Sequence, residues 1–351
     1  MRRTTTRTTR AAAVLAAAAL ALSACGGSDT DSASSGDGAS SGSSDVKVGM
    51  AYDVGGRGDQ SFNDSAAAGM DQAVKEFGMT SQESEAKDGE AESAREERLR
   101  TFAEAGYDPI IAVGFAYSGS VAKVAKEYPE AHFAIIDDEA AKAGNVANLV
   151  FSEEQGSFLV GAAAALKSKK NHIGFIGGVE TPLIQKFEAG YAAGAKQVKP
   201  DIEIDSVYLT QPPDFSGFGD PAKGQTAAQG MYDGGADIVF HAAGGSGGGV
   251  FQAATDSGAK AIGVDADQYK TADAKVKKVI LTSMLKNVDV AVNEYLTEVN
   301  GGTFPSGVTR YDLKVDGVGY SKSGGFVDDI EDELEGYKKQ IIDGDIKVPT
   351  S

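Results

Sequence analysis

The chain has 351 residues, a formal net charge of −18 at pH 7 and a single cysteine, Cys25. So acidic a chain is not expected to bind nucleic acid or an anionic lipid surface through a broad basic patch. With one cysteine the chain cannot form an internal disulfide, so burial of apolar side chains must stabilise the fold. The length is sufficient for two domains of ordinary size.

The first 24 residues have the pattern of a signal peptide. Four arginines between positions 2 and 10 precede an apolar run at 11–21, which is too short to span a bilayer as a helix. Leu22-Ser23-Ala24-Cys25 resembles a bacterial lipobox, in which the cysteine thiol carries a diacylglycerol. We therefore predict that residues 1–24 are removed and that Cys25 is lipidated; the alternative is a short buried helix with a chance cysteine. The arginine pair at positions 2 and 3 leaves Sec and twin-arginine export open.

Residues 25–45 are expected to form a flexible tether. From Gly26 to Asp45 the chain contains only Gly, Ser, Asp, Ala and Thr, which cannot bury a core. Random-coil scaling gives this segment a reach of about 25 Å. Cleavage after residue 24 would remove four arginines and no acidic residue, taking the formal net charge from −18 to −22. The sequence therefore predicts an acidic body held at the extracytoplasmic face of the cell membrane.

From residue 46 onwards, short β-rich runs alternate with longer amphipathic or alanine-rich segments. Strands are predicted at 46–52, 110–113, 133–136, 173–176, 204–209, 237–241, 261–264 and 279–282, and residues 149–151 begin a change of register into the helix that follows them. Helices are predicted at 92–105, 120–128, 155–167, 183–198, 222–232 and 250–256, with two more from the apolar spacing at 67–77 and 330–341. Strands separated by helices indicate parallel sheets with right-handed crossovers.

Two such series in one chain predict an α/β protein with two doubly wound parallel-sheet lobes. We expect lobe 1 to contain residues 46–151 plus about 267–303, and lobe 2 to contain 152–266 plus about 304–351. The alternative is one large α/β domain. In doubly wound folds the ligand lies beside the carboxyl ends of the strands. A secreted, tethered protein with two such lobes is most economically a solute-binding protein.

Residues that directly follow the predicted strands are therefore the candidates for a binding site. After the first strand, a glycine-rich stretch at 53–60 leads to Phe62 and Asn63. A phenylalanine face can stack on a planar ring, and an asparagine amide offers one acceptor and two donors. The alternatives are a core aromatic for Phe62 and an N-cap, for a helix beginning at Asp64, for Asn63.

Further candidates follow the later strands. Asp137 stands at the first position after its strand, where its carboxylate could accept from ring N–H groups, although a run of acids is often a solvated face. The loop at 214–221 carries Phe215 and Phe218, one of which could close over a ligand. The turn at 244–249 is rich in glycine and could offer backbone N–H groups, but no Gly-Lys-Ser/Thr follows, which excludes a P-loop.

Asp265 directly follows the predicted strand at 261–264, and Lys286 stands just beyond the last predicted strand at 279–282. Asp265 could accept two hydrogen bonds from a vicinal diol, and Lys286 could donate to a ligand hydroxyl while pairing with an acid. No nucleophile elbow or catalytic triad is recognisable, and His132, His172 and His241 are widely spaced. We therefore predict a protein that is not an enzyme and has no catalytic residues, metal or cofactor.

Seven segments in this order resemble one protein family. They are Asp-Val-Gly-Gly at 53–56 with Ser-Phe-Asn at 61–63, Ile-Asp-Asp at 136–138, and the segments 220–224, 234–238, 243–247, 263–268 and 282–286. Together they resemble the basic membrane protein family of lipoproteins, also called purine nucleoside receptor A-like, which are substrate-binding components of ABC importers. The resemblance covers residues 46 to 349. It implies a type I periplasmic-binding-protein fold with three hinge strands and a purine nucleoside held between two phenylalanines.

The resemblance also implies roles for individual residues. Phe62 matches one stacking residue, and Phe218 matches the other better than Phe215 does. The positions that match the base-edge contacts are Asn63 and Asp137, with Asp138 as the alternative to Asp137. The positions that match the ribose contacts are Asp53, Gly244, Asp265 and Lys286.

The sequence thus predicts a lipid-anchored extracytoplasmic solute-binding protein that captures a nucleoside, in the first place a purine nucleoside. Its partners would be the permease and ATPase subunits of an ABC importer, and the membrane through the lipid on Cys25; we expect a monomer and no nucleic-acid partner. The alternatives are a ligand-sensing lipoprotein that signals to a membrane partner, a receptor for another small solute such as a sugar, and a secreted nucleoside hydrolase.

Overall fold

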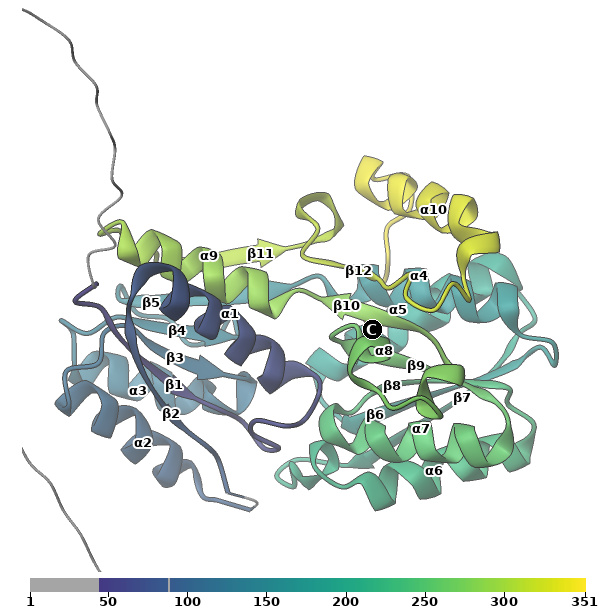
Figure 1. Cartoon of the computed structure of the whole chain (residues 1–351), viewed down its shortest axis with the longest axis horizontal. Helices are drawn as coiled ribbons and strands as arrows, with labels where there is room; N and C mark the ends of the chain where they lie inside the picture. The colour runs from purple at the N-terminus through teal and green to yellow at the C-terminus, as the bar shows by residue number, and fades with distance from the viewer. Residues whose placement is uncertain (1–43, 88) are drawn as a thin grey trace, which may run out of the picture. The chain divides into compact units, whose positions relative to one another are not determined.

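The computed structural model describes residues 44–87 and 89–351 and contains two six-stranded sheets (Figure 1). In the first sheet the strand order is β11-β5-β4-β3-β1-β2, and in the second it is β12-β10-β9-β8-β6-β7. The predicted signal peptide, the lipidation site Cys25 and the predicted tether up to residue 43 lie outside the described residues. No helix among the described residues is long and apolar enough to cross a membrane.

The first sheet and its helices form the first lobe, and all of its strand pairs are parallel. Strands β3, β4 and β5 are buried along their whole length, as expected for parallel strands covered by helices on both faces. The elements of this lobe are β1 (Lys47–Ala51), α1 (Phe62–Phe77), β2 (Thr80–Ser84), α2 (Glu92–Glu104), β3 (Ile110–Val113), α3 (Ser118–Glu127), β4 (Phe133–Ile136), β5 (Val146–Phe151), α9 (Val288–Asn300) and β11 (Gly307–Tyr311).

The second sheet and its helices form the second lobe. Its strand pairs are parallel except for the pairing of β12 with β10, which is antiparallel. The elements of this lobe are α4 (Glu153–Lys167), β6 (His172–Val179), α5 (Pro182–Val198), β7 (Glu203–Thr210), α6 (Pro221–Gly234), β8 (Ile238–Ala242), α7 (Gly247–Ser257), β9 (Lys260–Asp265), α8 (Gln268–Thr271), β10 (Ile280–Lys286), β12 (Val318–Tyr320) and α10 (Glu331–Asp343).

The chain passes between the two sheets three times (Figure 1). The passages follow β5, follow β10, and join β11 to β12. The predicted α/β fold with two parallel-sheet lobes joined by three connections is therefore confirmed. Because parallel strands in each sheet end on the same side, the residues after them are brought to one edge of each lobe.

The strand pairing differs from the predicted lobe boundaries in the last third of the chain. The division at residue 151 agrees with the two sheets, but residues 280–286, which were predicted for lobe 1, form β10 and pair with β9 in the second sheet. Conversely, β11 pairs with β5 in the first sheet, although residues 304–351 were predicted for lobe 2. The chain leaves the second sheet only after Lys286. Strand β10, which ends there, is almost fully buried and has a neighbour on each side in this sheet, β9 and β12.

Helices α4 and α5 cross in close contact because glycines line their interface. A Cβ atom at Gly194 would lie 1.9 Å from the carbonyl oxygen of Phe158, and one at Gly161 would lie 2.1 Å from that of Tyr191. The obstructing atoms are backbone atoms, which cannot rotate away. The two helices can therefore keep this separation only with glycine at both positions.

We expect Gly194→Ala to lower the free energy of unfolding by about 1–3 kcal/mol, the usual cost of overpacking a rigid interface. Chemical denaturation measures this value. Gly230→Ala is the matched control, because Gly230 is exposed within α6 and a Cβ there would meet no atom within 4 Å. The control should be neutral or stabilise by about 0.5–1 kcal/mol through its higher helix propensity. Equal effects of the two substitutions would contradict this account of the interface.

Candidate functional site

A cavity of about 550 Å³, its open mouth included, lies between the two lobes at the carboxyl ends of their strands. All eight residues predicted from the sequence to bind a ligand line it: Asp53, Phe62, Asn63, Asp137, Phe218, Gly244, Asp265 and Lys286. The remaining lining residues are Val54, Asp59, Gly114, Phe115, Leu183, Ile184, Phe187, Ala242 and Val264. The predicted residues are thus brought together in space, although they are spread over most of the chain.

Strand ends place the charged groups of this cavity. Asp137 directly follows β4, Asp265 is the last residue of β9 and Lys286 is the last residue of β10. Asp137 and Asp265 have φ angles of 67° and 62°, a left-handed conformation that aspartate tolerates better than most residues. The neighbouring Asp138 instead accepts hydrogen bonds from the backbone N–H groups of residues 140 and 141, so Asp137 is the carboxylate that lines the cavity.

The two phenylalanines that were predicted to stack on the ligand come from different lobes. Phe62 is the first residue of α1, and Phe218 ends a short 3₁₀ turn at Ser216–Phe218 that follows β7. Phe218 has room because residue 178 is glycine: a Cβ there would lie 2.4 Å from the Phe218 ring. Of the two phenylalanines left open by the sequence, Phe218 lines the cavity and Phe215 does not.

Lys286 is an almost fully enclosed charge of the site, with 1% of its surface exposed. Its ammonium donates a hydrogen bond to Asp137 Oδ2 and lies 3.4 Å from Glu153 Oε1. Burial favours the neutral amine, but the carboxylates of Asp137, Glu153 and Asp265 outweigh it and raise the pKa of Lys286 above its usual range. The ammonium also lies 4.9 Å from the centre of the Phe62 ring. Lys286 is therefore a fixed positive charge at the floor of the cavity.

The carboxyl groups around this lysine bind protons more readily than exposed aspartates. Burial raises the pKa of Asp53 to about 6 and that of Asp137 to about 7, and it also raises the pKa of Asp265. At Asp137 the positive charge of Lys286 opposes this shift without cancelling it. The acceptor strength of the cavity therefore changes between pH 8 and pH 5.

Asn63 holds the loop after β1 against the start of α1. Its Oδ1 accepts from the backbone N–H of Asp53 at 3.2 Å, while its Nδ2 donates to the carbonyl of Val54 at 3.4 Å and to Asp59 Oδ2 at 3.1 Å. Both amide protons are thus engaged, and only one lone pair of Oδ1 remains for a ligand. The N-cap interpretation of Asn63 is wrong, because α1 already begins at Phe62.

The first turn of α1 is instead capped by Asp59, a residue that the sequence analysis did not select. Its carboxylate accepts from the backbone N–H groups of Ser61, Asn63 and Asp64 at 2.9–3.1 Å. Phe115 was also not predicted. It follows β3 almost directly, so a search of the residues after each predicted strand could have found it. Phe187 lies in the helix α5, where no sequence pattern distinguishes a cavity residue from a core residue.

Direct hydrogen bonds join the two lobes beside the cavity. Ser61 Oγ, in the first lobe, donates to Asp265 Oδ2 in the second at 2.6 Å. Gln268 Nε2 donates to the carbonyl oxygen of Gln60 at 3.0 Å. Gly244 has a φ of 52° and opens the turn before α7, where a Cβ would lie 3.1 Å from the carbonyl oxygen of Phe218. The lobes thus meet around the cavity, with one oxygen of Asp265 already engaged.

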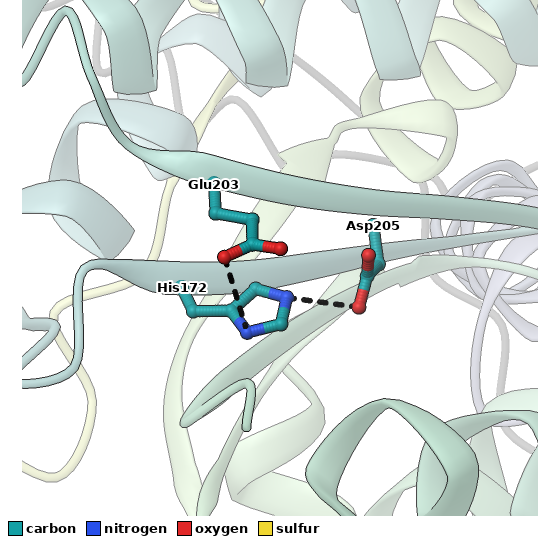
Figure 2. A group of neighbouring side chains, drawn as sticks. All are labelled: His172, Glu203 and Asp205. Atoms are coloured by element: carbon teal, nitrogen blue, oxygen red, sulfur yellow. Dashed lines mark hydrogen bonds and ion pairs between the residues drawn. The ribbon is translucent and has the colours of Figure 1, made fainter. Parts of the chain in front are cut away.

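A second polar cluster lies on the edge of the second sheet (Figure 2). His172 of β6 has its Nε2 2.9 Å from Asp205 Oδ2 and its Nδ1 3.9 Å from Glu203 Oε2, both on β7. Within residues 44–87 and 89–351 this is the one group of three such side chains whose ligand atoms, all within 4.8 Å of one another, could hold a metal ion. Each ring nitrogen of His172 faces a different carboxylate, Nε2 that of Asp205 and Nδ1 that of Glu203. The cluster links β6 to β7.

Comparisons with known proteins give a consistent family and fold. The family described as "ABC transporter substrate-binding protein PnrA-like" matches residues 46–351. The "CD4+ T-cell-stimulating antigen" of Listeria innocua is 38% identical over 348 residues, covering 93% of this chain and 94% of the relative. The "ABC transporter nucleoside-binding protein BmpA" of Lactococcus lactis is 34% identical over 327 residues, with 87% and 90% covered.

Among solved structures, a solute-binding protein of an ABC transporter system from Aeropyrum pernix K1 superposes with a TM-score of 0.76 at 29% identity. The match covers 87% of this chain and 94% of that protein. The resemblance and the type I periplasmic-binding-protein fold predicted from the sequence are therefore confirmed.

Proposed function

We propose that this chain, which belongs to the PnrA-like family of ABC transporter substrate-binding proteins, is a lipid-anchored extracytoplasmic receptor that captures a purine nucleoside and delivers it to an ABC importer. The observation that carries the proposal is the composition of the cavity between the lobes. It combines phenylalanines from both lobes with three aspartates and one buried lysine at strand ends. That combination suits a ligand with a flat apolar part and a hydroxyl-rich part.

The base is assigned to the two phenylalanines. Phe62 comes from the first lobe and Phe218 from the second, so a planar ring between them would be held only when the lobes are together. Base–aromatic stacking contributes about 1–3 kcal/mol per contact and tolerates any base. Asn63 and Asp137 would supply hydrogen bonds to the base edge, with Asn63 limited to the free lone pair of its Oδ1.

The ribose is assigned to Asp53, Gly244, Asp265 and Lys286. Carboxylates accept hydrogen bonds from the two hydroxyls of a vicinal diol, and the Lys286 ammonium can donate to a hydroxyl oxygen. A 2′-deoxy analogue would leave a buried acceptor unpaired, at a cost of about 1–3 kcal/mol. The site should therefore prefer ribonucleosides.

The anchor and the transport step rest on the sequence and on the family. The lipobox-like segment ending at Cys25 would carry a lipid at the start of the mature chain, and the following tether would keep the binding body near its permease. Capture by closure of two lobes presents a different surface to a partner from that of the open protein. We expect neither catalysis nor a cofactor in this role.

Calorimetric titration of residues 26–351 with adenosine, guanosine, inosine, uridine and ribose tests the proposal. We expect the purine nucleosides to bind, and ribose alone to bind far more weakly because it lacks a base to stack. Failure of all three purine nucleosides to bind would contradict the proposal. Tight binding of ribose with no gain from the base would favour a sugar receptor.

The affinity for a ribonucleoside should fall as the pH is lowered from 8 to 5. The pKa of Asp137 is raised to about 7 and that of Asp53 to about 6, so both carboxyls accept hydrogen bonds at pH 8 and progressively lose that capacity on protonation. Titrations at half-unit pH intervals measure the change, with circular dichroism to show that the protein stays folded. Asp53→Asn is the comparison variant, in which the part of the decrease near pH 6 should disappear. An affinity that stays constant or rises toward pH 5 would contradict these roles.

A further inference from the structure

Phe215 lies outside the ligand cavity but bridges the two lobes. It belongs to the loop between β7 and α6 of the second lobe and is half-buried. Its ring meets that of Phe115, in the first lobe, edge to face, with centroids 5.9 Å apart and planes at 73°. The guanidinium carbon of Arg95, on α2 of the first lobe, lies 5.8 Å from the centre of the same ring.

The side chain of Arg95 is held in place by contacts within the first lobe. Only 5% of its surface is exposed, and its Nε lies 3.6 Å from Glu90 Oε1. Its guanidinium carbon also lies 6.0 Å from the centre of the Tyr117 ring. An aromatic ring that packs on such a fixed and largely dehydrated cation gains a stronger cation–π attraction than it would on an exposed one.

Phe115 lies at the boundary between the ligand cavity and a second pocket that is open to solvent. Val54 and Phe115 line both, whereas Arg95 and Phe215 line only the second. Phe115 also meets Phe218 edge to face at 6.4 Å, so three phenylalanines form a contact across the lobes at this boundary. Separating the lobes would break the contacts of Phe215 with the first lobe.

We propose that Phe215 is a latch residue: by packing on Phe115 and Arg95 it holds the lobes together and slows release of the ligand, without touching the ligand. This inference rests on the proposed capture of a nucleoside between the lobes. Phe215 and Phe218, three residues apart in one loop, would then have different roles. The first contacts the ligand, and the second stabilises the closed arrangement.

The test compares ligand release from residues 26–351 and from Phe215→Ala. Stopped-flow displacement of the fluorescent nucleoside 2-aminopurine riboside by excess adenosine gives the release rate. We expect release to accelerate about tenfold, since one edge-to-face pair and one cation–π contact are lost. Calorimetry should show affinity loss by a common factor for adenosine, guanosine and inosine, because Phe215 does not line the ligand cavity.

Two further variants serve as controls for the effect of Phe215→Ala. Phe326→Ala removes another half-buried phenylalanine that packs on a lysine, at 3.9 Å from Lys260, away from the ligand cavity; it should leave release unchanged. Phe215→Leu keeps an apolar side chain but removes the ring, and should accelerate release several-fold even if the alanine variant folds poorly.

The outcomes separate the latch from the proposed function. A wild-type protein that binds nucleosides, with Phe215 variants that release them at the wild-type rate, would overturn the latch alone. An affinity loss that differs strongly between bases would also overturn it, because it would indicate direct contact with the ligand. Absence of nucleoside binding by the wild-type protein would refute the proposed function and the latch with it.

Discussion

Lys286→Met should lower the free energy of unfolding by about 3–5 kcal/mol at pH 8, the cost of leaving buried charges without their partner. The ammonium is hydrogen-bonded to Asp137 and lies 3.4 Å from Glu153, and both carboxylates are buried. Methionine has a similar length and no charge, so the substitution removes the cation while keeping most of the volume. The same variant should lose measurable nucleoside binding.

The pH dependence of this loss has a definite sign. Burial already raises the folded-state pKa of Asp137 from the ordinary value of 3.8 to about 7, so the folded state holds more protons than the unfolded state between these values. The contribution of Asp137 to the free energy of unfolding therefore falls as the pH rises between these two values. Without the ammonium, the pKa of Asp137 rises further, so the free energy of unfolding falls more steeply with rising pH. The destabilisation by Lys286→Met should consequently be smaller at pH 5.5 than at pH 8.

Denaturant unfolding of both proteins at the two pH values measures this difference. Lys322→Met is the matched control, because Lys322 forms an exposed ion pair with Glu331 at 2.6 Å and such pairs contribute about 0–1 kcal/mol. A loss below about 1 kcal/mol for Lys286→Met, or the same loss at both pH values, would show that the lysine does not neutralise these carboxylates.

Phe62→Ala and Asp265→Asn should weaken nucleoside binding in different ways. The phenylalanine variant should lose about 1–3 kcal/mol for every purine nucleoside, since stacking does not depend on base identity. Asp265→Asn should chiefly reduce the preference for ribo- over 2′-deoxynucleosides, because the amide can accept at only one atom. Asparagine also tolerates the φ of 62° at this position, so the backbone should not be strained.

Calorimetry with adenosine and 2′-deoxyadenosine on the wild type and both variants separates the two roles. If Asp265→Asn leaves the preference for the ribonucleoside intact, the assignment of Asp265 to the ribose is wrong. If Phe62→Ala affects one base and not another, the ring does not act by stacking alone.

Most of the fold could be predicted because its buried elements have a clear apolar pattern. Strands β3 and β4 coincide with the predicted ranges, and α10 ends before Gly344, which takes a φ of 82°. Strands β2 and β11 were not predicted, because they lie at a sheet edge and expose nearly all their side chains. Helix α9 was also missed: its valines at 288, 290 and 292 alternate as in a strand.

The candidate site could be predicted because parallel sheets gather the residues that follow their strands. This rule, together with the family resemblance, selected eight residues that all line one cavity. It could not reveal how the side chains pair across the lobes, because those contacts depend on how the lobes meet. The position of Glu153 beside Lys286 could therefore not be predicted, nor that Asp59 and not Asn63 caps α1.

A crystal structure of residues 26–351 grown with inosine would test the central proposal most directly. It should show the base between the rings of Phe62 and Phe218, with the ribose hydroxyls within hydrogen-bonding distance of Asp265 and Lys286. Inosine bound outside this cavity, or in it with the base away from both rings, would contradict the proposed mode of capture.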